Sequence, residues 1–351
     1  MVLVFDNDAV EAFAEQFEHH AFVLFRNDNI PESSAVANRR YRGWCGCSTT
    51  VTAMIWILLL EAFDDKLPEG ATMERLLWGL LLVNGYDTEI NNASRVGGVD
   101  EATFSRWSWF FVKEISDLEC QVVSLIGSCS SCSSAFKKIC LLFATHLCLQ
   151  IDWDNRKIGD IGNDCLVSVD GVDCQVKGRI NFDGTPDLGC KSQKCQTGGA
   201  LRYEVAIAIR SSCIVWIAGP HLPGNFNDLQ IFRQSGLIEQ LEENERVEAD
   251  DGCIAEAPRY VKCPGSVYIN EEQRRLRGRV RMHHESINER LKNWGILSKK
   301  FRGENAEHAA AFRAVAAITQ LAMDDGEELL MDVPEYDDNL TDADILAQFG
   351  V

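Results

Sequence analysis

The chain has 351 residues, 46% of them hydrophobic and 25% charged, which is enough for two domains with ordinary globular cores. Its formal net charge of −19 argues against a general binder of polyanions. The longest apolar run, Val51–Leu60, covers only about half a membrane span, and the acidic N-terminus does not resemble a signal peptide. We therefore expect no membrane association.

Residues 1–157 are expected to form an all-α domain. Apolar residues recur there with helical spacing, and residue types that favour helix N-caps precede two of the runs, at Ser48 and Asp100. Gly85 is expected to end another of the helices. The expected helices are Val10–Phe25, Thr49–Ala62, Thr72–Asn84, Asp100–Leu118 and Ala135–Leu149.

Two roles are open for the helix expected at Asp100–Leu118. It follows a Gly97–Gly98 turn, so it could be the second helix of a DNA-binding helix-turn-helix. However, its basic side chains are only Arg106 and Lys113, and its apolar residues share one face. A core helix is therefore the simpler interpretation.

Residues 158–323 are expected to form an α/β domain. Short runs rich in β-branched residues begin after a polar, glycine-containing segment, and helical patterns alternate with the later ones. The expected strands are Cys165–Val169, Cys174–Ile180, Tyr203–Ile209, Ile214–Ala218 and Arg246–Ala249, and the expected helices follow Asp228 and span Glu285–Leu297 and Glu307–Met323. Residues 324–351 hold ten acidic and no basic residues, and we expect them to form a flexible acidic tail.

Four acidic residues occupy positions that suit a metal site. Asp170 follows the apolar run Leu166–Val169, Asp228 stands where a helix N-cap belongs, Asp250 ends an expected strand, and Glu285 lies on a late helix. Mg²⁺ prefers hard oxygen ligands from a few carboxylates, water and phosphate. Each acid taken alone could instead be an ordinary turn or cap residue.

Four sequence blocks occur in order between Ile158 and Gln320. They are Val169-Asp170-Gly171, Gly219-Pro220-x-x-Pro223-Gly224-x-x-x-Asp228-x-x-Ile231-Phe232, Ala249-Asp250-Asp251-Gly252 and Arg281-x3-Glu285-x6-Lys292. Together they resemble the DDE-superfamily endonucleases of the PIF/Harbinger transposase type. The last block also resembles the signature of related bacterial insertion-sequence transposases.

The resemblance implies an RNase H-like fold, with a mixed sheet flanked by helices, and an Asp-Asp-Glu triad. Asp170 would be the first acid and Glu285 the last. For the middle acid we favour Asp250, because the second acid of RNase H-like folds ends the strand beside the first. Asp228 is the second choice and Asp251 the third. These acids would hold two ions of Mg²⁺ or Mn²⁺.

The implied reaction is hydrolysis of a DNA phosphodiester bond followed by attack of the 3′-hydroxyl on target DNA. The alternative is a domesticated, non-catalytic DNA- or protein-binding factor that retains the nuclease scaffold. Three departures leave room for it. Val172 stands where the family often has Thr, Cys253 replaces a usual Tyr, and Gly278 stands where the bacterial signature has Tyr.

A basic stretch within the acidic chain predicts DNA contact. From Arg274 to Arg302 there are ten Lys or Arg residues against two Glu, which could neutralise backbone phosphates or pair with the acidic tail. Arg281 and Lys292 would contact phosphate, since Lys292 follows Glu285 by two helical turns. The other DNA-binding candidates are Arg274, Arg275, Arg277, Arg279, Lys299 and Lys300.

The fourteen cysteines are irregularly spaced and predict reduced thiols. The pairs Cys45/Cys47, Cys129/Cys132 and Cys190/Cys195 have no partner pair at a zinc-site spacing, so structural zinc is not expected. We expect nuclear localisation in a eukaryote and a cytoplasmic protein otherwise. We also expect a homo-oligomer and, given the net charge, a separate DNA-binding partner protein.

Overall fold

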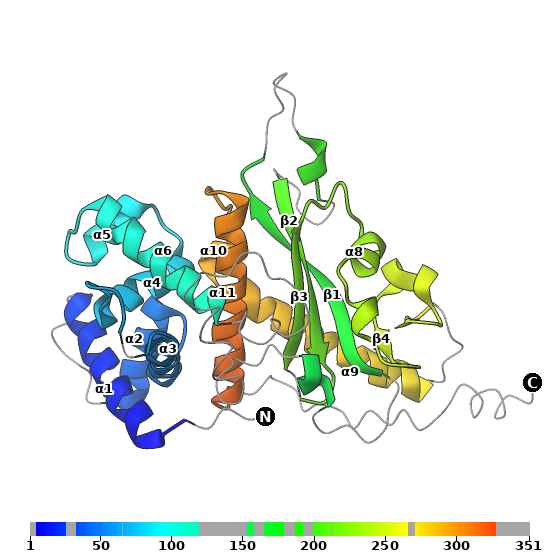
Figure 1. Ribbon diagram of the computed structural model, residues 1–351, viewed down its shortest axis with the longest axis horizontal. Helices are drawn as coiled ribbons and strands as arrows, with labels where there is room; N and C mark the ends of the chain where they lie inside the picture. Colours follow the sequence, from blue (N-terminus) through cyan, green and yellow to red (C-terminus); the bar gives the residue numbers. More distant parts are fainter. Residues whose placement is uncertain are drawn as a thin grey trace, which may run out of the picture. The chain divides into compact units, whose positions relative to one another are not determined.

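The computed structural model describes residues 5–25, 33–64, 66–118, 153–157, 165–178, 187–192, 199–211, 213–265 and 271–327, except for the side chains of 154, 155, 271–277 and 279. The chain divides into two compact units (Figure 1). Met1–Leu149 and Arg290–Glu327 form the helical unit, and Gln150–Glu289 and Glu328–Val351 form the sheet unit. The helix expected at Ala135–Leu149, the pair Cys129/Cys132 and most of the expected tail lie outside the described residues.

The helical unit confirms the helices predicted at Val10–Phe25, Thr49–Ala62, Thr72–Asn84, Asp100–Leu118 and Glu307–Met323. The single helix predicted at Glu285–Leu297 is wrong, because one helix ends at Lys292 and another begins at Gly295. The predicted N-caps are confirmed as well, since the Ser48 hydroxyl accepts from the amide of Val51 at 3.1 Å and Asp100 accepts from the amides of Ala102 and Thr103. The unit contains α1 (Asn7–Leu24), α2 (Ser34–Cys45), α3 (Thr49–Ala62), α4 (Met73–Gly85), α5 (Glu89–Arg95), α6 (Glu101–Asp117), α10 (Gly295–Ser298) and α11 (Asn305–Asp324).

Helix α6 is a core helix on its apolar face. Phe104, Trp107, Phe111 and Ile115 are all buried there, as the sequence predicts, and α6 packs against α4 and α11. Two helices of this unit, α2 and α5, are not predicted, because α2 buries only a narrow stripe of three residues and α5 has only seven residues.

Among the described residues, no single helix is long and apolar enough to cross a membrane. Helices α2 and α3, which are bent by 55° relative to each other, would be so only as a pair and by length and composition alone.

The sheet unit is built on a mixed five-stranded sheet in the order β3-β2-β1-β4-β5. β1 pairs antiparallel with β2, and β2 with β3, whereas β4 runs parallel to both β1 and β5. The strands are β1 (Cys165–Val176), β2 (Gly199–Ala208), β3 (Ile214–His221), β4 (Arg246–Glu248) and β5 (Val261–Lys262), and the α-helices are α8 (Asp228–Gln234) and α9 (Glu271–Lys292), which ends in the helical unit. The predicted mixed α/β class, with helices flanking the sheet, is confirmed.

Strand β1 replaces two of the predicted strands. The prediction of separate strands at Cys165–Val169 and Cys174–Ile180 is wrong, because the ladder with β2 continues through Gly171, which pairs with Glu204. Pairing with β4 ends at Ser168. Asp170 therefore lies inside β1, two residues beyond the last pair with its parallel neighbour.

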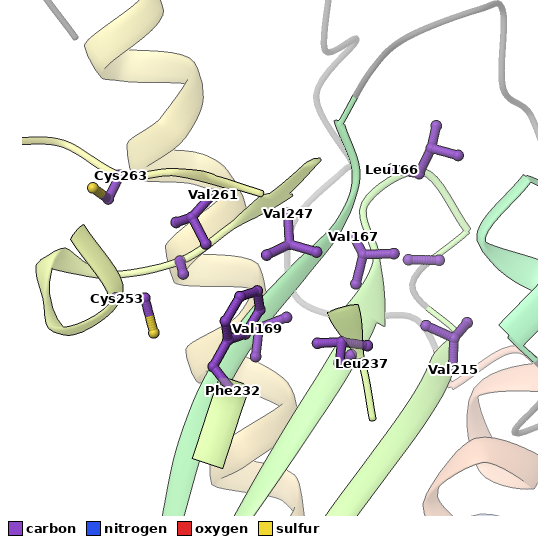
Figure 2. Packing of buried hydrophobic residues seen from close by; sticks show 13 residues of the cluster. Leu166, Val167, Val169, Val215, Phe232, Leu237, Val247, Cys253, Val261 and Cys263 are labelled. Atoms are coloured by element: carbon purple, nitrogen blue, oxygen red, sulfur yellow. The ribbon is translucent and has the colours of Figure 1, made fainter. Parts of the chain in front are cut away.

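Alternate residues of β1 face the two flanking helices. Val167 and Val169 lie in a buried apolar cluster with Phe232 of α8 (Figure 2). The intervening residue, Ser168, has its hydroxyl 2.8 Å from Nδ1 of His284 on α9. Helices α8 and α9 thus cover opposite faces of the sheet, and Asp170 falls on the face of Ser168.

Candidate active site

A pocket in the sheet unit gathers acidic side chains from several elements, and we call it the acidic pocket. Its acidic lining residues come from β1, β2, the start of α8 and the position that precedes the 3₁₀-helix η6 (Asp251–Glu256). The lining residues are Val169, Asp170, Gly171, Arg202, Glu204, Asp228, Ile231, Ala249, Asp250 and Cys253. The structure thus brings the predicted Asp170, Asp228 and Asp250 to one place.

Asp170 is held by donors from its own strand and from α9. The amide of Gly171 donates to Oδ1 of Asp170 at 2.7 Å, and Nδ2 of Asn288 donates to Oδ2 at 2.9 Å. A donor therefore reaches each carboxyl oxygen, and these two donors define the plane of the carboxylate.

Asp228 is the first residue of α8 and not its N-cap, which corrects the prediction. Asn227 caps the helix: its side chain accepts from the amide of Gln230 at 2.9 Å, and the Gln230 side chain accepts from the Asn227 amide at 3.0 Å. Because this reciprocal capping box occupies the helix end, the Asp228 carboxylate points to other partners. Its Oδ1 accepts from Arg202 at 2.7 Å.

Arg202 links Asp228 to a second carboxylate on β1. The guanidinium donates to both oxygens of Asp173, at 2.6 and 2.9 Å, in the bidentate geometry that Arg favours. The Asp173 hydrogen bonds raise the pKa of Arg202. This network is not predicted from the sequence, although Arg202 and Glu204 in the otherwise apolar run Leu201–Ala208 were a signal that could have been used.

Gly171 and Gly252 lack a side chain where the carboxylates of Asp228 and Asp250 lie, and so leave space beside them. A Cβ at Gly252 would lie 2.7 Å from Oδ1 of Asp250 and 3.5 Å from Oδ2 of Asp228. A Cβ at Gly171 would lie 3.1 Å from Oδ1 of Asp228. The carboxylates of Asp228 and Asp250 therefore converge on a hollow that a side chain would fill.

Glu204 is a buried acid of the pocket that the sequence analysis also missed. Burial, together with the charge of Asp228, raises the pKa of Glu204 to about 7, against a smaller opposing effect of its hydrogen bond with Ser235. Its Oε2 is buried and has no hydrogen-bond partner among the described residues. An acid that can hold a proton near neutral pH thus lies beside the three aspartates.

Glu285 and Asp251 do not line the acidic pocket. Glu285 is exposed on α9, one turn before Asn288. Asp251 is exposed too, and its Oδ1 accepts from the amide of Gly265 at 2.8 Å. Of the two acids that follow β4, only Asp250 faces the pocket.

The basic candidates are spread over both units. Arg281 is exposed on α9 within the sheet unit, and Lys292 ends that helix within the helical unit. Lys299 donates to the carbonyl of Gly85 and lies 3.7 Å from Asp87. Lys300 is exposed, whereas the side chains of Arg274, Arg275, Arg277 and Arg279 lie outside the described ones.

Residues 190–320 match a family model. It is the model of the DDE superfamily endonucleases. The match supports that superfamily for this chain, and the matched segment contains Asp228, Asp250 and Glu285 but begins after Asp170. No curated protein and no solved structure matches the chain.

DDE endonucleases generally use divalent metal ions, and the acidic pocket suits such an ion in its chemistry. Within the described ranges, no three His, Cys, Asp or Glu side chains are grouped as ligands of one ion. Mg²⁺ does not need such a group, since it commonly binds one or two carboxylates and completes its shell with water and substrate phosphate. The hollow between Asp228 and Asp250, with Asp170 in the same pocket, fits that demand.

Proposed function

We propose that the chain is a divalent-metal-dependent DNA endonuclease of the transposase type, related to the PIF/Harbinger group. The observation that carries the proposal is the acidic pocket, in which Asp228 and Asp250 from the matched segment meet Asp170 from β1. The alternative, a non-catalytic factor on the same scaffold, remains an outcome of the test below.

An RNase H-like fold is the finer part of the proposal. It is supported by the sheet order and by the parallel pairing of β1 and β4 at its centre. Asp170 lies just beyond the end of this pairing, and Asp250 follows β4 by two residues. The two acids thus reach the same edge from neighbouring parallel strands, which is the arrangement that the resemblance implies.

In this proposal Asp170, Asp228 and Asp250 are the carboxylates available to two ions of Mg²⁺ or Mn²⁺, each ion taking one or two of them. Glu285 approaches from α9 when DNA is bound. The ion would activate a water molecule and neutralise charge on the scissile phosphate. Arg202 fixes the orientation of Asp228 through a hydrogen bond of 2.7 Å. Glu204 can keep a proton close to the reacting groups, because its pKa is raised to about 7.

DNA contact is proposed for Arg281 and for the other basic residues between Arg274 and Lys300. Arg281 supports it best, since it is exposed on α9 one turn before Glu285. The formal net charge of −19 is the reason to propose a separate DNA-binding partner protein as well. Homo-oligomerisation and nuclear localisation are part of the same proposal.

A nicking assay on supercoiled plasmid DNA with Mg²⁺ or Mn²⁺ tests the function. We expect nicked circles from the wild type and background levels from Asp170→Asn, Asp228→Asn, Asp250→Asn and Glu285→Gln. Asp251→Asn is the matched control and should nick like the wild type, since Asp251 is exposed and does not line the pocket. Equal nicking by all variants would refute the site, and no nicking by the wild type would favour the non-catalytic factor.

A further inference from the structure

Helix α9 and strand β1 are joined by two polar contacts with matched spacing. Oγ of Ser168 lies 2.8 Å from Nδ1 of His284, and Oδ2 of Asp170 accepts a hydrogen bond from Nδ2 of Asn288 at 2.9 Å. Two residues along a strand span about 6.6 Å, and four residues along a helix span about 6 Å. The two contacts therefore follow each other along β1 and α9 in step. The contact between Ser168 and His284 fixes the register of α9 on β1, and so determines that Asn288 reaches Asp170.

The imidazole of His284, which contacts Ser168, has a single protonation state at physiological pH. Burial, reinforced by the neighbouring His283, lowers the pKa of His284 to about 3, so the ring is neutral at physiological pH. A neutral, buried ring beside Ser168 holds the helix without bringing a charge near Asp170.

The contact between Asn288 and Asp170 leaves half of the Asn288 amide unsatisfied. Only the nitrogen of the Asn288 amide is satisfied, because its Oδ1 is buried and has no partner among the described residues. An unsatisfied buried acceptor costs on the order of 1–3 kcal/mol. A residue that is poor for stability yet donates to a proposed metal ligand calls for a functional explanation.

Glu285 does not provide this contact. It is exposed, and Asn288 lies one turn further along α9. Of these two helix residues, Asn288 is thus the one that touches the carboxylate of Asp170.

We propose that Asn288 is a positioning residue that orients the Asp170 carboxylate for a divalent cation, an inference that rests on the proposed function. Its N–H donates to Oδ2 while the Gly171 amide donates to Oδ1, so both oxygens of the carboxylate are held in one orientation. Residues that orient metal ligands typically change metal affinity about 10- to 100-fold when they are replaced.

Binding of Mn²⁺ to the full chain, followed by the electron paramagnetic resonance signal of free Mn²⁺, tests the proposal without any activity readout. Asn288→Leu and Asn288→Ala should bind Mn²⁺ about 10- to 100-fold more weakly. Their thermal midpoints without metal should be nearly unchanged, since the lost hydrogen bond is offset by removal of the unpaired oxygen. Asn288→Gln, which keeps an amide donor, should recover part of the affinity, and Glu289→Gln on the exposed side of the helix should bind like the wild type.

The outcomes separate this inference from the proposed function. Wild-type affinity in both Asn288→Leu and Asn288→Ala would overturn the positioning role while leaving the metal site intact. Affinity in Asn288→Asp equal to or above that of the wild type would overturn it as well, because the oxygen and not the N–H would then be the group that matters. No Mn²⁺ binding by the wild type would overturn the proposed function and this inference with it.

Discussion

Asp173 and Arg202 stand directly opposite each other on β1 and β2 and form a buried, bidentate ion pair. The side chains are 1% and 9% exposed, respectively. Because Arg202 also reaches Asp228, one guanidinium ties the sheet to the first residue of α8. The position of Asp228 in the acidic pocket thus depends on the ion pair between Asp173 and Arg202, neither of which is a proposed metal ligand.

Replacement of Arg202 should therefore lower the free energy of unfolding and release the carboxylate of Asp228. Arg202→Met leaves Asp173 buried without its cation, and the loss of one partner of a buried pair typically costs about 3–5 kcal/mol. Urea unfolding measures the change in the free energy of unfolding. Arg233→Met is the control: its pair with Glu256 involves an arginine side chain that is 49% exposed, and such pairs contribute about 0–1 kcal/mol. Equal losses in the two variants would contradict the structural role of Arg202.

The choice between the two acids that follow β4 can be tested directly. Both residues are exposed, but only Asp250 lines the acidic pocket, whereas Oδ1 of Asp251 accepts from the amide of Gly265. A bound cation supplies several kcal/mol, and each 1.36 kcal/mol is tenfold in rate, so Asp250→Asn should slow nicking by on the order of 100-fold or more. Asp251→Asn should stay within about threefold of the wild type. The reverse ranking would move the site to Asp251.

Glu204 predicts a dependence of stability on pH in protein freed of metal with EDTA. Its pKa is raised from 4.5 to about 7 on folding, so between these values the folded state binds more protons than the unfolded state. Stability is then lost as pH rises from about 4.5 to 7, by roughly 3 kcal/mol in the limit of the full shift. Glu204→Gln should lack this contribution and unfold at higher urea concentration than the wild type at pH 8. Identical pH profiles for the two proteins would contradict the raised pKa.

Because the space beside Gly252 is open, we expect Gly252→Ala to reduce metal affinity more than it reduces the stability of the fold. A Cβ there would lie 2.7 Å from Oδ1 of Asp250, so Gly252→Ala must displace that carboxylate. We expect Mn²⁺ affinity to fall about tenfold, as measured by calorimetry. Gly278→Ala is the control, since a Cβ there meets nothing within 4 Å and replaces glycine within α9. It should leave affinity unchanged and stabilise the helix by about 0.5–1 kcal/mol.

Local signals in the sequence predicted much of the fold. Ser48 and Asp100 cap their helices as expected, because N-cap chemistry depends on adjacent amides. The continuous β1 was not predicted, because Gly171 looks like a turn and becomes part of a strand only through its partner Glu204 on β2. The cap of α8 was misplaced by one residue, since Asn227 and Asp228 both suit that position by residue type. Only their contacts separate them: Asn227 forms the capping box with Gln230, and Asp228 accepts from Arg202.

The site was predictable in part. Asp170, Asp228 and Asp250 were recognisable from their neighbours, and they line one pocket. Glu204 and Asn288 were missed because their roles come from burial and from contacts across elements, which no spacing along the chain expresses. The role of Glu285 stays a prediction, since the residue is exposed and outside the pocket lining.

The helical unit consists of an N-terminal segment, Met1–Leu149, and a much later one, Arg290–Glu327. Helix α11 contacts α6 and α3 and buries Phe312, Val315 and Ile318, yet it follows the whole sheet segment in sequence. During translation, α1 to α6 must leave the ribosome long before α11 exists to cover their apolar surface. Domains usually mature in the order of their synthesis. Here the segment Gln150–Glu289 of the sheet unit is complete before α11 is made, so the N-terminal helices have to wait with exposed apolar surface, which favours binding by chaperones.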